Sequence, residues 1–279
     1  MAVPSDPSDP GLSPSYLAEA PRAAATGVPG LFRGPPAYRP RTPWPIGAAV
    51  VAAFGIVIFA MSAGLTGSLI ATPPADARSG DGVWPFVAAL SVSQLSAILL
   101  TLYAARAFRG RPRDVLSLRA PAQGAAVYPV ALVLMLAIFG CYTWIVWLID
   151  PNVVTKDVSP FVALMRSEAW WLALVAIAVG APLMEELVFR GFLLSAISRS
   201  RLGFAAASVI TSACWTSLHA SYSLFGLVEV FAVGLYFSWL LWRTGSLRVP
   251  IFCHAAYNAG IATFLMMYEL PSPVPAMAG

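Results

Sequence analysis

The chain has 279 residues, of which 58% are hydrophobic and only 11% are charged, and its mean hydropathy is +0.74. This composition leaves too little polar surface for an ordinary water-soluble domain, so most of the chain must lie in lipid. The net charge of +4 is modest and the basic residues flank apolar stretches, so no nucleic-acid partner is expected.

Residues 1–44 are rich in Pro, Ala, Ser and Gly and show no hydrophobic periodicity. Such a segment cannot bury enough surface to offset the entropy lost on ordering, and we expect a disordered tail. Seven apolar stretches follow, each about long enough to cross the roughly 30 Å hydrocarbon layer as a helix. They span approximately residues 46–72, 84–108, 127–149, 169–197, 204–221, 225–242 and 249–269. The predicted fold is therefore an all-α, polytopic transmembrane helical bundle.

The orientation follows from the distribution of Arg and Lys between the loops. Arg106, Arg109, Arg111, Arg113 and Arg119 cluster between the second and third spans. Basic residues favour the cytoplasmic side, so this loop and the N-terminus should be cytoplasmic in a multi-pass protein of the cell membrane.

A few ionisable residues lie within the apolar stretches, where a charge costs at least about 2.5 kcal/mol and so needs a partner or a function. In the fourth span, Arg190 lies one helical turn after Glu186, at the i,i+4 spacing of an ion pair. Glu185 faces a different direction, where an unpaired and desolvated carboxylate suits a general base. An ion pair that only locks helix packing is the alternative explanation for this motif.

Two further motifs place a histidine on a helix face with an i,i+4 companion. Trp215 precedes His219 by four residues, so the indole ring can orient the imidazole. His254 precedes Asn258 by four residues, with alanines between them that permit close helix approach. Each pair alone could be structural. Glu229 has no such companion, and we expect a polar contact that lines the same cavity.

The order of these motifs, Glu185-Glu186-x3-Arg190, then aromatic-x3-His219, then His254-x3-Asn258, resembles the CPBP family of intramembrane proteases, which includes the type II CAAX prenyl endopeptidases. The resemblance covers roughly residues 170–260.

The resemblance implies that Glu185 and His219 activate a water molecule, while His254 and Asn258 stabilise the oxyanion. Glu186, Arg190 and Trp215 would support the site, with Trp215 standing where the family usually has Phe. The expected function is an intramembrane endopeptidase acting on a membrane-associated protein or peptide, CAAX-type or bacteriocin-like.

The expected domain organisation, from composition, hydropathy and this resemblance together, has four parts. Residues 1–44 form the cytoplasmic tail, 45–150 the N-terminal transmembrane helices, 151–270 the protease domain with a catalytic core in spans four to seven, and 271–279 a short C-terminal tail.

Three alternatives stay open at this stage. Glu185, His219 and His254 could instead hold a catalytic zinc ion, because two histidines and a glutamate form a common zinc-ligand set. A non-proteolytic immunity or scaffold protein could keep the same fold. A proton-coupled transporter would also use intramembrane Glu and His, although we find no internal repeat.

Straight, upright helices do not bring the predicted site together. Counting about 1.5 Å per residue places Glu185 roughly 21 Å from Arg199, whereas His254 lies only roughly 9 Å from Arg248. Tilting, a kink at Pro182, or an interfacial course of residues 192–203 could remove this conflict.

Overall fold

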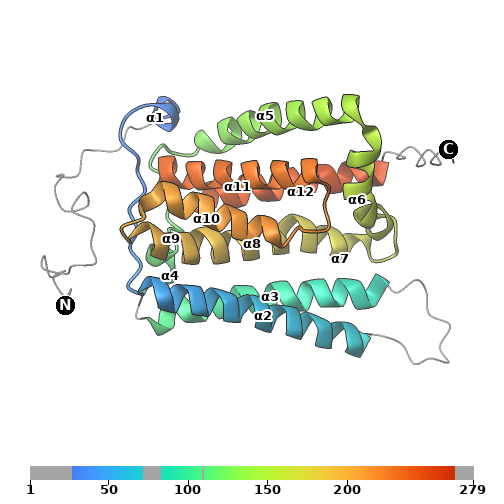
Figure 1. The fold of residues 1–279 in the computed structure, drawn as a ribbon, viewed down its shortest axis with the longest axis horizontal. Helices are drawn as coiled ribbons and strands as arrows, with labels where there is room; N and C mark the ends of the chain where they lie inside the picture. The colour runs from blue at the N-terminus through green and yellow to red at the C-terminus, as the bar shows by residue number, and fades with distance from the viewer. Residues whose placement is uncertain (1–26, 72–82, 109, 268–279) are drawn as a thin grey trace, which may run out of the picture.

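A computed structural model describes residues 27–71, 83–108 and 110–267, and these residues form helices and loops without a strand. The expected C-terminal tail, residues 271–279, lies outside the described residues. The helices are α1 (Pro29–Phe32), α2 (Ile46–Ala71), α3 (Val83–Ala107), α4 (Pro112–Val115), α5 (Val127–Ile149), α6 (Pro151–Met165), α7 (Trp170–Val175), η2 (Ala176–Gly180), α8 (Ala181–Glu185), η3 (Glu186–Leu193), α9 (Leu194–Ser198), α10 (Gly203–Ser217), α11 (Leu224–Thr244) and α12 (Arg248–Met267). The long helices run lengthwise through the molecule, and α6 lies across one end of it (Figure 1).

Six helical stretches of the described residues are long and apolar enough to cross a membrane. They correspond to six of the seven expected spans, and the polytopic helical bundle is confirmed. The remaining expected span, 204–221, is the 15-residue α10, which extends over only about 22 Å. The count of seven spans is therefore not confirmed.

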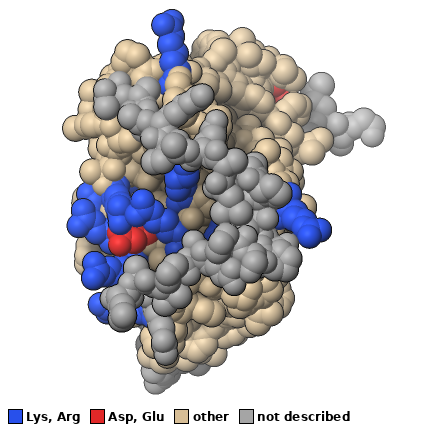
Figure 2. Space-filling model, turned by 90° about the vertical axis from the view of Figure 1, so that its left-hand side faces the viewer, with Lys and Arg blue, Asp and Glu red and all other residues tan. Residues whose placement is uncertain are grey.

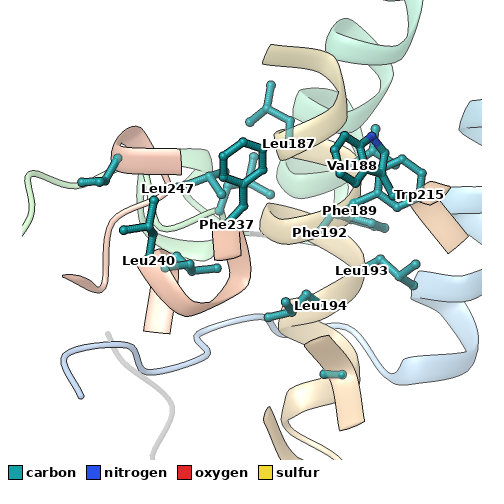
Figure 3. Close-up of a cluster of buried hydrophobic side chains, with 14 of the residues drawn as sticks. Leu187, Val188, Phe189, Phe192, Leu193, Leu194, Trp215, Phe237, Leu240 and Leu247 are labelled. Carbon is teal, nitrogen blue, oxygen red and sulfur yellow. The ribbon is translucent and has the colours of Figure 1, made fainter. Parts of the chain in front are cut away.

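The fourth span is one helical stretch, Trp170–Ser198, that includes two π-helical segments, η2 and η3. Residues 192–198 continue this helix, which argues against an interfacial course of residues 192–203, one of the three remedies considered for the conflict in helix depth. The η3 segment is buried along its whole length. Figure 3 shows Phe237 and Leu247 on one side of η3 and Trp215 on the other. The fourth span is thus the central element around which the other helices pack.

Helices α2 and α3 form an antiparallel pair along one edge of the bundle (Figure 1). Gly64 permits their close approach, because an added Cβ would lie 2.8 Å from the Ala89 carbonyl oxygen. This pair belongs to the expected N-terminal unit, residues 45–150. Since α3 also packs against η2, η3 and α8, the division at residue 150 remains a prediction.

Residues 27–44 are packed against the bundle, which corrects the expectation of a disordered tail over 1–44. The guanidinium of Arg243, in α11, donates hydrogen bonds to the carbonyl oxygens of Gly30, Leu31, Arg33 and Gly34. Further along, Trp44 is buried and stacks on Phe192 with the ring centroids 4.5 Å apart. The contacts come from distant helices, so local composition does not reveal them. Residues 1–26 lie outside the described residues.

Candidate active site

Two consecutive glutamates at the α8–η3 junction face different surroundings. Glu186 is completely buried and lies 3.1 Å from Arg190 Nη1, as the i,i+4 spacing predicts. The Arg190 guanidinium carbon lies 4.4 Å from the ring centroid of Trp215 and 5.7 Å from that of Phe237. Cation–π contacts of this kind favour a desolvated guanidinium, so the pair is a packed internal element.

His254 connects the two glutamates. Its Nδ1 lies 3.2 Å from Glu186 Oε1, and its Nε2 lies 3.8 Å from Glu185 Oε2. The imidazole also stacks on Phe237, with the ring centroids 5.0 Å apart. A second hydrogen-bonded nitrogen is the usual means of fixing an imidazole orientation, so Glu186 aims Nε2 towards Glu185. Sequence reasoning assigned Glu186 only to Arg190 and missed its contact with His254. The two residues lie on different helices, 68 positions apart in the sequence.

Glu185 is held on its other side by the indole of Trp215. The Nε1–H group donates a 2.6 Å hydrogen bond to Glu185 Oε2. The Trp215 ring also meets His219 edge-on at 5.2 Å between centroids, and the Trp215 carbonyl oxygen lies 3.1 Å from His219 Nδ1. Trp215 therefore contacts His219 as expected, and it positions the Glu185 carboxylate, a contact that the sequence did not predict.

Asn258 lies one turn after His254 on α12. Its Nδ2 donates a 3.0 Å hydrogen bond to the Ile177 carbonyl oxygen in η2. An amide nitrogen carries two hydrogens, so one N–H group of Asn258 is engaged here and a second remains for another acceptor.

The four predicted catalytic side chains, Glu185, His219, His254 and Asn258, line one cavity of about 450 Å³. Its walls come from the fourth span, the end of α10, α11 and α12, which correspond to the expected spans four to seven, and also from α3, α5 and α6. The cavity is therefore not confined to spans four to seven. Glu229 lines it too, and accepts hydrogen bonds from Thr143 and Tyr257.

Further polar residues that were not singled out from the sequence also line the cavity, among them Gln94, Asp157 and Tyr222. Gln94 is the one amide residue of α3, and an amide within an apolar span was the sequence feature that could have identified it. Tyr222 lies in the loop between α10 and α11, edge-on to His219 at 5.3 Å between centroids. Burial raises the pKa of Tyr222 to about 12, so its hydroxyl stays protonated at neutral pH.

The start of α12 resolves the conflict between the depths expected for Glu185 and His254 along their helices. An added Cβ on Gly191 would lie 3.0 Å from Leu247 Cδ2, so these two residues share one level in the bundle. Gly191 lies eight residues before Arg199, or about 12 Å along the helix. Arg248 therefore does not lie at the level of Arg199. The error was to assume a common depth for both arginines.

The described residues do not support the zinc alternative. Among them, no three His, Cys, Asp or Glu side chains are grouped so that they could hold one metal ion. Glu185, His219 and His254 share a cavity without converging on a single point of coordination.

Comparison with known proteins shows what this region is similar to. Residues 167–260 match the family model described as Type II CAAX prenyl endopeptidase Rce1-like. An Escherichia coli protein described as "Uncharacterized 24.3 kDa protein" is 38% identical over 86 residues, which cover 30% of this chain and 39% of that protein. The chain thus matches less than half the length of this relative. No solved structure matches the chain.

Proposed function

We propose, from the Rce1-like character of residues 167–260, that this chain is an intramembrane endopeptidase that hydrolyses a peptide bond of a membrane-associated substrate. The observation that carries the proposal is the position of the Glu185 carboxylate. It lies between the Trp215 indole N–H and His254, in a cavity that His219 and Asn258 also line.

In the proposed mechanism, Glu185 with His219 accepts a proton from a water molecule as the water oxygen attacks the scissile carbonyl carbon. His254 and the free N–H of Asn258 donate hydrogen bonds to the resulting oxyanion. The accepted proton passes to the leaving amine as the C–N bond breaks. Fixed donors in a water-poor cavity stabilise such an anion well, because they need no reorganisation during the reaction.

The supporting contacts divide between orientation and charge balance. Glu186 orients His254 through Nδ1, and Arg190 neutralises Glu186, so the second carboxylate takes no part in proton transfer. The proposed protease domain comprises residues 151–270 and lies within the bilayer. In this proposal the N-terminus lies in the cytoplasm.

The test compares the purified wild type with Glu185→Gln and His254→Ala, in lipid vesicles that contain a library of membrane-anchored peptides. We expect cleavage by the wild type and at least about a hundredfold loss in each variant, since each removes a group that acts in the transition state. Glu168→Gln is the matched control. Glu168 accepts a hydrogen bond from Trp84 Nε1 and does not line the cavity, so its substitution should leave cleavage intact.

Two outcomes would change this conclusion. Unaltered cleavage by Glu185→Gln would contradict the proposed role of Glu185. Failure of the folded wild type to cleave any peptide in any lipid, with a chelator or with added zinc, would favour the non-proteolytic scaffold.

A further inference from the structure

The charges that line the cavity have one sign. Glu185, Glu229 and Asp157 contribute carboxylates, and among the described lining residues none is Lys or Arg. The remaining polar lining groups are amides, hydroxyls, the indole and the two imidazoles. A peptide that enters this cavity therefore meets acidic groups without a compensating cation from the protein.

Glu229 is held in a fixed position in the cavity wall. Its Oε1 lies 3.1 Å from Thr143 Oγ1 and 3.0 Å from the Tyr257 hydroxyl, so α5, α11 and α12 all contribute to the contact. Tyr257 follows His254 by three residues on α12, which places it about 4.5 Å further along the helix. Glu229, Glu185 and His254 line the same cavity of about 450 Å³, and successive residues of an extended peptide are about 3.3 Å apart. A peptide bound at Glu185 therefore also brings residues near its scissile bond to Glu229.

Asp157 adds a second carboxylate to the same cavity. Its two oxygens accept hydrogen bonds from the backbone N–H of Ser223, at 2.7 Å, and from the Ser223 hydroxyl, at 2.6 Å. An added Cβ on Gly226 would clash with Asp157 Oδ2, so a larger residue at this point would displace the carboxylate. The aspartate is thereby held against the first turn of α11, on the wall formed by α6.

We propose that this cavity selects a peptide segment with a positive charge within two residues of the scissile bond and disfavours one with a free C-terminal carboxylate there. This inference rests on the proposed protease function and names its substrate class. A cation next to Glu229 gains a fixed acidic partner, whereas an anion must be buried beside carboxylates or force one of them to take up a proton.

The basic surface of the molecule cannot produce this preference. Arg39, Arg41 and Arg119 surround a shallow pocket at the opposite end of the bundle, where basic side chains gather (Figure 2). Attraction to that end would favour acidic peptides and would weaken with added salt. A preference for basic peptides therefore cannot come from this basic end of the molecule.

The test uses membrane-anchored peptides that are identical except for Lys, Leu or Glu next to the cleaved bond, each with a C-terminal amide or a free carboxylate. We expect kcat/KM to be about tenfold higher for Lys than for Glu, the ratio that corresponds to about 1.4 kcal/mol. In Glu229→Gln the ratio should fall below about twofold, while Glu168→Gln should keep the wild-type ratio. Equal kcat/KM for the Lys and Glu peptides, or an unchanged ratio in Glu229→Gln, overturns the inference and leaves the proposed function intact.

A binding measurement separates the two proposals. The Glu185→Gln variant is expected to bind the peptides without cleaving them, so their dissociation constants can be compared without turnover. Tighter binding of the Lys peptide by about tenfold supports the charge preference even if the wild type cleaves nothing, in which case only the protease function fails. Equal binding of all peptides in this variant overturns the charge preference.

Discussion

Adjacent residues in one helix can have unrelated roles when their side chains enter different environments. Glu185 faces a cavity and Glu186 is buried against Arg190, and the i,i+4 spacing predicted this division. The contact of Glu186 with His254 could not be predicted in the same way. It depends on the packing of α12 against the fourth span, which no local spacing encodes.

Substitution of each glutamate by Gln should therefore have different effects, on stability at Glu186 and on cleavage at Glu185. Glu186→Gln leaves the Arg190 charge buried without a counter-ion, which should lower the free energy of unfolding by about 3–5 kcal/mol. Glu185→Gln should keep near-wild-type stability and lose cleavage. Thermal unfolding of both purified variants in detergent, beside the cleavage assay, measures this. Comparable stability of the two variants would show that Arg190 does not depend on Glu186.

At the scale of elements, apolar length predicted where six spanning helices lie, and all six begin within one residue of the predicted start. The π-helical segments η2 and η3 were not predicted, because α- and π-helical turns share the same apolar composition. The short α10 was overestimated because apolar residues continue past its end at Ser217 into the loop that carries His219.

The contact of α3 with η2 includes a close approach at one glycine. An added Cβ on Gly180 would lie 2.0 Å from Gln94 Oε1, and Gln94 is buried. Gly180→Ala must displace this side chain, and overpacking of this kind typically costs about 1–3 kcal/mol. Thermal unfolding should show the loss.

Two further variants identify the cause of that loss. Gly180→Ala combined with Gln94→Ala should recover much of the stability, because the clashing amide is gone. Gly140→Ala, in α5, has no atom within 4 Å of the added Cβ and should be neutral or stabilising. An equal loss in the Gln94→Ala background would mean that the glycine is required for another reason.

Across the whole molecule, the sequence predicted a membrane bundle and a polar site inside it, but not how residues 27–44 are placed. Residues 27–44 looked like the rest of a Pro-rich tail, yet Arg199 and Ser195 hydrogen-bond to Thr42 and so attach this segment to the fourth span. The sequence does not indicate that a guanidinium or carbonyl group will have a hydrogen-bond partner more than 150 residues away. Composition therefore underestimated the order of this region.

The same arrangement places the cavity and the basic surface at different levels of the bundle, which gives the orientation of the protein a direct consequence. If the arginine-rich end is cytoplasmic, α6 and the cavity wall that it forms face the opposite side of the membrane. Two exposed positions report on these ends. Ala120 borders the basic pocket, and Ser159 lies on α6.

In a variant without Cys141, Cys214 and Cys253, a membrane-impermeant maleimide added to intact cells should label Ser159→Cys, and it should label Ala120→Cys only after lysis. The expected pattern would mean that a substrate reaches Glu185 from the outer side, so that its cleavage site must be exported or lie in the outer half of the bilayer. The reverse pattern would contradict the orientation predicted from the arginines, and cytoplasmic segments of membrane proteins would then be the substrates to test first.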